Sequence, residues 1–140
     1  DIPGIGFGLG KERLIMLMEN AGETFGGDLK PQVLIAWIGD EAKEYSLGLL
    51  HELRSKGIRA DIDSRERNLK GQMKYANKLG AAYVIVLGDS ELENKSAKLK
   101  NMETGDETEI SLGDSFAEDF SLHVITAQIA KEDNGEIIKF

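Results

Sequence analysis

The residues with the clearest chemical potential are the arginines and lysines between positions 54 and 78. This stretch carries eight basic and three acidic side chains, a net charge of +5, whereas the other 115 residues carry −13. Guanidinium and ammonium groups bind phosphate, and exposed amides bind base edges. A basic patch on an acidic protein favours selective contact with RNA over general binding to polyanions. An ordinary solvated surface is the alternative interpretation of the same charges.

Residues 68–79 are predicted to form the helix that presents these cations. Asn68 is suited to cap this helix and Gly80 to end it. Lysines recur every four residues along it and therefore share one side. The candidate RNA-binding residues, in the helix and in the loop before it, are Arg65, Arg67, Lys70, Gln72, Lys74 and Asn77. Tyr75 could stack on a base or pack in the core, and the pattern leaves both open.

A second group of residues, at positions 4–13, indicates phosphate chemistry of another kind. Glycine alternates there with Ile5, Phe7 and Leu9, which predicts a strand with one bare face that a flat ligand could approach closely. A helix is predicted over residues 11–21, and Arg13 in its first turn could hold a phosphate. Tight packing of the strand against a neighbour, with the arginine left on the surface, is the alternative interpretation.

This glycine pattern fits neither of the two common phosphate-binding motifs. The third glycine follows the second too closely for the dinucleotide-binding fingerprint, which needs a turn at that point. The segment is not a P-loop either, because Glu12 stands where a Ser or Thr must hold magnesium.

The composition excludes several other classes of site. The chain has 140 residues and no cysteine, which excludes disulfides, thiolate metal sites and cysteine nucleophiles. Its two histidines, His51 and His123, are too few for a histidine-rich site, so no bound metal is expected. No apolar run reaches the ~18 residues that span a bilayer, and no signal peptide opens the chain. We therefore expect a cytoplasmic protein that binds neither membrane nor DNA, and, because residue 1 is not Met, a piece of a longer chain.

Strands and helices alternate along the predicted structure after residue 31. The predicted strands are residues 33–38, 58–62 and 82–87, and the predicted helices are residues 40–56, capped by Asp40 and ended by Gly57, and residues 68–79. This β-α-β-α-β order implies parallel strands covered by helices. Residues 95–101 and 107–112 then predict a hairpin, and Asp114 is expected to cap a last helix.

Two of these segments, taken together, resemble a known family. The sequence Gly6-Phe7-Gly8-Leu9-Gly10-Lys11-Glu12-Arg13-Leu14 resembles motif 3 of class II aminoacyl-tRNA synthetases, most closely the histidyl-tRNA synthetases. Residues 67–81 resemble a helix of that family's anticodon-binding domain, with Gly71 where lysine is usual. Residues 38–42 are also similar, so the resemblance covers nearly all of residues 4–112.

The resemblance implies an α/β fold and a division of the chain. The expected fold is a three-layer α/β/α anticodon-binding domain with a five-stranded mixed sheet, preceded by a strand and helix from the end of a catalytic domain. The expected divisions are this remnant at residues 1–22, a linker at 23–31, the anticodon-binding domain at 32–131 and a tail at 132–140. Because motifs 1 and 2 are absent, we expect this chain alone to be inactive as a ligase.

The resemblance also implies the reaction of the full-length enzyme, which is the ATP-dependent ligation of histidine to tRNA(His) by a homodimer. Gly6, Gly8 and Gly10 would lie beside the adenine, and Arg13 would be catalytic by holding the γ-phosphate of ATP, which binds with Mg²⁺. Neither ATP nor Mg²⁺ is expected to bind this chain alone. The implied partners of the full-length enzyme are therefore tRNA(His), histidine and ATP.

Three other proteins share part of this pattern. The first is the anticodon-binding domain of a glycyl-, threonyl- or prolyl-tRNA synthetase. The second is the synthetase-like regulatory subunit of histidine biosynthesis, which lacks the domain implied by residues 32–112. The third is a flavodoxin-like interaction domain, which would not explain residues 4–13.

Overall fold

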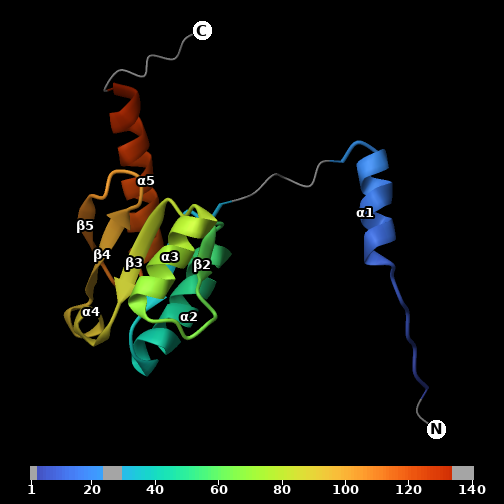
Figure 1. Ribbon diagram of the computed structural model, residues 1–140, viewed down its shortest axis with the longest axis horizontal. Helices are drawn as coiled ribbons and strands as arrows, with labels where there is room; N and C mark the ends of the chain where they lie inside the picture. The colour runs from blue at the N-terminus through green and yellow to red at the C-terminus, as the bar shows by residue number, and fades with distance from the viewer. Residues whose placement is uncertain (1–2, 24–29, 134–140) are drawn as a thin grey trace.

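Five strands of the computed structural model form one mixed sheet with helices around it (Figure 1). The structure describes residues 3–23 and 30–133, and side chains up to residue 130. The elements in order are α1 (Lys11–Asn20), β1 (Val33–Trp37), α2 (Asp40–Ser55), β2 (Ala60–Ile62), α3 (Leu69–Leu79), β3 (Tyr83–Leu87), α4 (Asp89–Asn94), β4 (Ser96–Asn101), β5 (Glu107–Ser111) and α5 (Phe116–Asp133). We call residues 30–133 the α/β unit and residues 3–23 the N-terminal segment. No helix in the described ranges is long and apolar enough to cross a membrane.

The strand order in the sheet is β2-β1-β3-β4-β5. The strands β2, β1 and β3 run parallel, with Ile35 of β1 aligned with Ile62 on one side and Ile85 on the other. The strands β4 and β5 continue the sheet as an antiparallel hairpin. Since helical crossovers join the parallel strands and a short turn joins the last two, the predicted five-stranded mixed sheet is confirmed.

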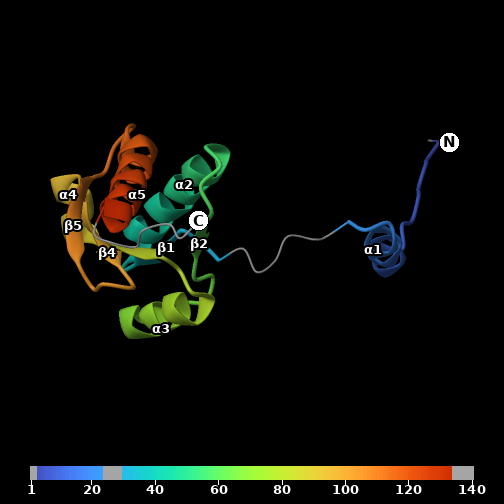
Figure 2. The same cartoon turned by 90° about the horizontal axis from the view of Figure 1, so that it is seen from above.

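Helices cover both faces of the sheet, as Figure 2 shows from above. Every residue of β1 is buried, because its sequence Val-Leu-Ile-Ala-Trp has an apolar side chain for each face. Val33 and Ile35 enter a core with residues of α2 and α5, and Leu34 and Ala36 enter a second core with residues of α3. The predicted three-layer α/β/α arrangement is therefore confirmed.

The helix α3 begins and ends as its sequence predicts, whereas two other helices do not start as predicted. The Asn68 side chain accepts a hydrogen bond of 2.9 Å from the Gly71 N–H, and Gly80 ends the helix with φ of 68°. Asp40 is not the cap of α2, because Gly39 takes that position with φ of 93°, and Asp40 instead lies in the first turn. The last helix begins at Phe116, since residues 113–115 form a turn in which the Phe116 N–H bonds the Gly113 carbonyl.

The N-terminal segment differs from its prediction. Its helix α1 forms as expected and Gly22 follows it with φ of 84°, but α1 buries no residue and stands apart from the sheet in both views. The predicted strand is wrong: residues 3–10 adopt no regular structure, and Ile5 and Phe7 are fully exposed. A strand needs a partner for its backbone hydrogen bonds, and no described strand lies beside this one. Most of the predicted linker (residues 24–29) and tail (residues 134–140) lies outside the described residues.

One edge strand of the sheet is short, and the other carries charged side chains. The edge strand β2 has only three residues. At the other edge, β5 exposes Glu107 and Glu109, and Lys98 and Lys100 of β4 lie 3.5 and 4.0 Å from the Glu107 carboxylate. Such edges disfavour pairing with strands of other molecules.

Candidate nucleic-acid interface

A pocket of about 500 Å³ lies where the loop after β2 meets α3. Its lining residues are Asp63, Ser64, Arg65, Arg67, Gly71, Lys74, Tyr75 and Lys78. The lining contains four cationic side chains and a single carboxylate, and we call this site the basic pocket. Such a surface suits an anionic ligand that also offers groups for specific hydrogen bonds.

The structure brings three of the six predicted RNA-binding residues together in this pocket: Arg65, Arg67 and Lys74. Lys70 and Asn77 are exposed on α3 but do not line it. Lys78, whose four-residue spacing from Lys74 was visible in the sequence, joins the lining. Asp63, Ser64, Gly71 and Tyr75 complete it, and no charge pattern singles them out.

Gln72 has a different position from the one predicted. Its side chain is 1% exposed, and its Oε1 accepts a hydrogen bond of 3.0 Å from the Trp37 N–H. Its Nε2 donates to the carbonyls of Trp37 at 2.8 Å and of Arg67 at 3.0 Å. The structure therefore corrects the expectation that Gln72 offers its amide to an RNA base. Its amide instead joins the end of β1 to the loop that lines the basic pocket.

In the lining of the basic pocket, Arg67 contacts both Asp63 and Tyr75. The Arg67 guanidinium lies over the Tyr75 ring, 5.0 Å from its centroid, and its Nη1 is 3.2 Å from Asp63 Oδ2. Asp63 is 2% exposed, and its Oδ1 accepts a hydrogen bond from the Arg65 N–H. Its Oδ2 is buried and has no hydrogen bond of good geometry among the described residues. The carboxylate therefore faces Arg67 with unused hydrogen-bonding capacity.

The nearby carboxylate of Glu66 is occupied by a lysine of another helix. Lys43 Nζ on α2 donates a hydrogen bond of 2.7 Å to Glu66 Oε1. This hydrogen bond lowers the pKa of Glu66 and raises the pKa of Lys43. Glu66 is thus ionised but neutralised by its partner, which limits its repulsion of an anion at the basic pocket.

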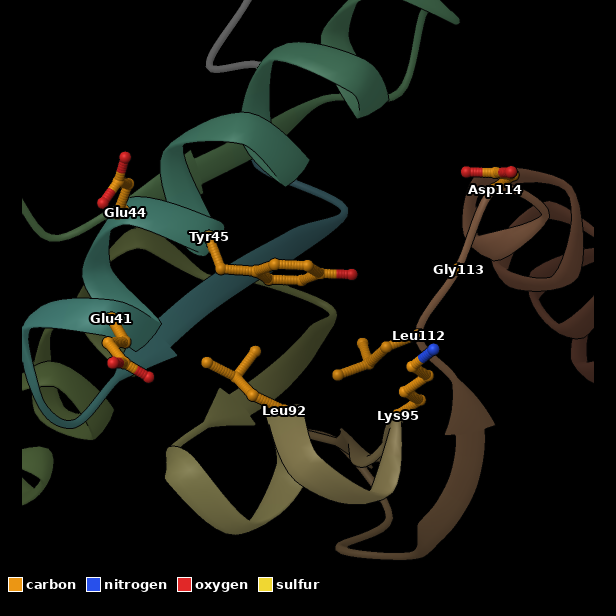
Figure 3. A pocket seen from close by; sticks show the side chains of 8 residues that line it. All are labelled: Glu41, Glu44, Tyr45, Leu92, Lys95, Leu112, Gly113 and Asp114. Atoms are coloured by element: carbon orange, nitrogen blue, oxygen red, sulfur yellow. The ribbon is translucent and has the colours of Figure 1, made fainter.

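Another concavity of the α/β unit has the opposite charge. It is an open groove of about 830 Å³ between α2, α4 and the segment after β5. Tyr45 points from α2 across it, above Leu92 and Leu112, while Glu41, Glu44 and Asp114 lie around it with Lys95 (Figure 3). Partial burial raises the pKa of Tyr45. We call this site the acidic groove, and its carboxylates would repel phosphate.

The predicted ATP-binding residues are not gathered into a site. Gly6, Gly8, Gly10 and Arg13 are exposed, and an added Cβ at Gly6 or Gly8 would have no heavy atom within 4 Å. In the residues that the structure describes, no group of three or more histidine or acidic side chains could hold a metal ion. The geometry here therefore supports no step that involves ATP or Mg²⁺.

Comparison with known proteins identifies the class to which the α/β unit belongs. A family model described as an anticodon binding domain matches residues 32–118. The chain therefore belongs to the family of anticodon-binding domains. Its relatives within that family include histidine–tRNA ligases. The ligase of Acetivibrio thermocellus is 54% identical over 110 residues, which are 79% of this chain and 26% of that protein.

Solved structures of aminoacyl-tRNA synthetases are also similar to this chain. The apo histidyl-tRNA synthetase of S. aureus matches with a TM-score of 0.64 and 43% identity over 79% of this chain and 28% of that chain. The RNA binding domain of threonyl-tRNA synthetase from Cryptosporidium parvum matches with a TM-score of 0.59 over 66% of this chain and 23% of that one. At 21% identity, this second match shows a shared fold alone. The chain thus corresponds to the anticodon-binding region of histidine–tRNA ligases, and it spans about a quarter of their length.

Proposed function

We propose that this chain binds the anticodon region of tRNA(His) through the basic pocket, as part of a longer enzyme that ligates histidine to tRNA. The observation that carries the proposal is the basic pocket itself, which lies within the part of the chain that matches the anticodon-binding family. Arg65, Lys74 and Lys78 are exposed there and supply charge for phosphate contacts. Lys70 and Asn77 extend this surface along α3.

The distribution of charge also favours RNA binding at the basic pocket. The basic pocket is formed by α3 and the loop before it, whereas the acidic groove is formed by α2, α4 and the segment after β5. Since α3 and α2 cover opposite faces of the sheet, a polyanion meets attraction on one side and repulsion on the other (Figure 2). The RNA therefore approaches the α3 side.

The N-terminal segment has a different part in this proposal. Residues 1–22 would belong to the catalytic domain of the longer enzyme, residues 23–31 would link the two parts, and residues 32–131 would form the anticodon-binding domain, followed by a tail at 132–140. In the longer enzyme, a cytoplasmic homodimer, Arg13 would hold the γ-phosphate of Mg²⁺-bound ATP beside Gly6, Gly8 and Gly10. The exposed apolar side chains of this segment support its contact with a further part of such an enzyme.

The binding proposal is tested by the salt dependence of tRNA(His) affinity. We expect Lys74→Ala and Lys78→Ala each to weaken binding by the 140-residue chain and to reduce the slope of log K against log salt by nearly one unit per lost phosphate contact. Lys98→Ala, an exposed lysine on β4, is the matched control and should change neither quantity. Unaltered affinity and slope in both α3 variants would show that the basic pocket is only a solvated surface.

The catalytic part of the proposal is tested by ATP–pyrophosphate exchange with histidine. We expect background exchange from the 140-residue chain, because it has only one of the three class II motifs. In the longer enzyme, Arg13→Lys should reduce exchange about tenfold or more while tRNA binding is unchanged, because lysine keeps the charge but lacks two parallel donors. Exchange at the rate of the unaltered enzyme would place Arg13 outside the ATP site.

A further inference from the structure

We propose that Arg67 is the residue of the basic pocket that reads a base, and that this base is a guanine of the bound RNA. The surrounding lysines and Arg65 then bind phosphate without reading sequence. The inference rests on the proposed function and adds to it the residue that sets specificity. Four features of the structure, each on a different residue, hold Arg67 in one position.

The guanidinium is fixed on two sides. Its Cζ lies over the Tyr75 ring, 5.0 Å from the ring centroid, and Asp63 Oδ2 lies 3.2 Å from its Nη1. A cation–π contact with an aromatic ring and an ion pair with a carboxylate together restrict the rotation of an arginine side chain. Its exposure of 32% leaves part of the group open toward the basic pocket that it lines.

The backbone of Arg67 is fixed as well. Its carbonyl accepts a hydrogen bond of 3.0 Å from the buried Gln72 amide, which also binds both backbone groups of Trp37 at the end of β1. Its N–H donates to the Arg65 carbonyl at 2.6 Å. Gln72 is therefore a positioning residue, since it places Arg67 relative to the rigid sheet.

Gly71 provides the space in which the Arg67 side chain lies. A Cβ at position 71 would be 3.0 Å from Arg67 Cβ and 3.3 Å from Arg67 Cδ. The first contact involves an atom close to the backbone, so it cannot be relieved by rotating the end of the side chain. Glycine inside a helix is unfavourable compared with alanine. Glycine at position 71 therefore lowers the stability of the helix but leaves room for the Arg67 side chain.

The charge around Arg67 favours a base over a phosphate. The buried Asp63 carboxylate offsets the positive charge of Arg67 and would repel a phosphate that came close, whereas Lys74 and Lys78 are exposed and lack such a partner among the ion pairs that the structure describes. A neutral base edge carries no such penalty. Guanine presents two adjacent acceptors, O6 and N7, which match the parallel donors of a guanidinium. A fixed, charge-compensated arginine thus contributes specificity more than affinity.

The test compares anticodon-arm RNA of tRNA(His) with versions in which each loop guanosine in turn is replaced by 7-deazaguanosine, which lacks the N7 acceptor. For the RNA modified at one particular loop position, the affinity of the 140-residue chain should be about tenfold lower than for the unmodified RNA. Arg67→Lys should bind both versions of that RNA equally well, with the salt slope of the unaltered chain. Gly71→Ala should reproduce this loss of preference. Arg65→Lys is the matched control, since Arg65 is exposed and no ring or carboxylate contact of its side chain is described, and it should keep the preference.

The possible results separate the inference from the proposed function. Equal affinity of the unaltered chain for all the RNAs, or a preference that survives Arg67→Lys, would overturn the role of Arg67 while leaving tRNA binding intact. Loss of the preference in Arg65→Lys as well would also overturn it, because Arg67 would then have no distinct role. No binding of the unmodified RNA by the unaltered chain would instead refute the proposed function. Urea unfolding of each variant shows that it is folded before its binding is measured.

Discussion

The α/β unit and the N-terminal segment contain similar apolar side chains, but only the α/β unit buries them. Leu34 of β1 is 0% exposed and lies in the core beneath α3, whereas Leu17 of α1 is 61% exposed. Both leucines fit regular sequence patterns. The difference shows that periodicity specifies the helix or strand, while burial depends on a second element that can cover it.

The helices of the two regions differ in the same way. The helix α3 has a side-chain cap at Asn68, a left-handed glycine at its end and buried residues on one side. The helix α1 has Gly10 at its start, no side-chain cap bond and no buried residue. Isolated helices shorter than about 12 residues are marginal in water. Thus α1 lacks, among the described residues, the packing that stabilises α3.

The largest difference between the two regions is expected when one leucine is truncated in each of them. Leu34→Ala should lower the free energy of unfolding of the α/β unit by about 2–5 kcal/mol, because it removes transfer free energy and leaves a cavity. Leu17→Ala should change it by less than about 0.5 kcal/mol. Urea unfolding monitored by circular dichroism measures both. Equal losses would mean that α1 packs on the α/β unit after all.

Removing the buried hydrogen bonds of Gln72 is expected to lower the free energy of unfolding by a smaller amount. Gln72→Leu keeps the volume of the side chain but leaves the backbone groups of Trp37 without partners, which should cost about 1–3 kcal/mol of unfolding free energy. Asn77→Leu removes an exposed amide from the same helix and should have little effect. The same unfolding experiment compares the two variants. If Gln72→Leu were neutral, the link between β1 and the loop of the basic pocket would be dispensable.

The smallest effect is expected from an exposed ion pair between Lys56, which follows α2, and Glu118 of α5. The hydrogen bond between Lys56 and Glu118 raises the pKa of Lys56 and lowers the pKa of Glu118. Because the folded pKa of Glu118 is lowered, its contribution to stability is present above the unfolded pKa and lost as the pH falls through the folded pKa. The Lys56 contribution is lost only in strong alkali, as the pH rises through its raised pKa.

Thermal unfolding at two pH values tests this contribution. Glu118→Gln should have a slightly lower melting temperature than the unaltered chain at pH 7, and the difference should shrink as the pH falls below the ordinary carboxyl range and through the folded pKa of Glu118. Glu93→Gln on α4 is a control exposed to solvent. A difference that persists in acid would show that the effect does not depend on the ionisation of Glu118.

Much of the α/β unit could be predicted from the sequence because its signals are local. The apolar runs of β1 and β3, the asparagine cap and terminal glycine of α3, and the turn between β4 and β5 each occupy a few adjacent residues. The helix α4 was not predicted, because its six residues include only one apolar side chain, Leu92. The strand expected at residues 4–10 failed for the opposite reason, since its local pattern is clear but a strand requires a partner.

In the basic pocket, too, local features could be predicted from the sequence, whereas contacts between distant residues could not. The spacing of lysines along α3 could be predicted, as could the position of Arg65 and Arg67 in the loop before it. The burial of Gln72 could not, because it depends on the backbone of Trp37, 35 residues earlier in the chain. The importance of Gly71 was also hidden, since it follows from the path of a neighbouring side chain and not from the conformation of glycine itself.

The edges of the sheet have a consequence for how such a domain is made and kept in solution. A chain that emerges slowly during synthesis exposes its strands before the whole sheet is formed, and open edges are then sites of aggregation. The three-residue β2 offers few backbone groups to a neighbouring chain, and the glutamates and lysines of the β4–β5 hairpin place charge at the opposite edge. Replacing Glu107 and Glu109 by threonine would leave the fold intact but remove the negative charge of the edge strand β5. The cost would therefore appear in the yield of soluble protein at high concentration, and not in its stability or in its affinity for RNA.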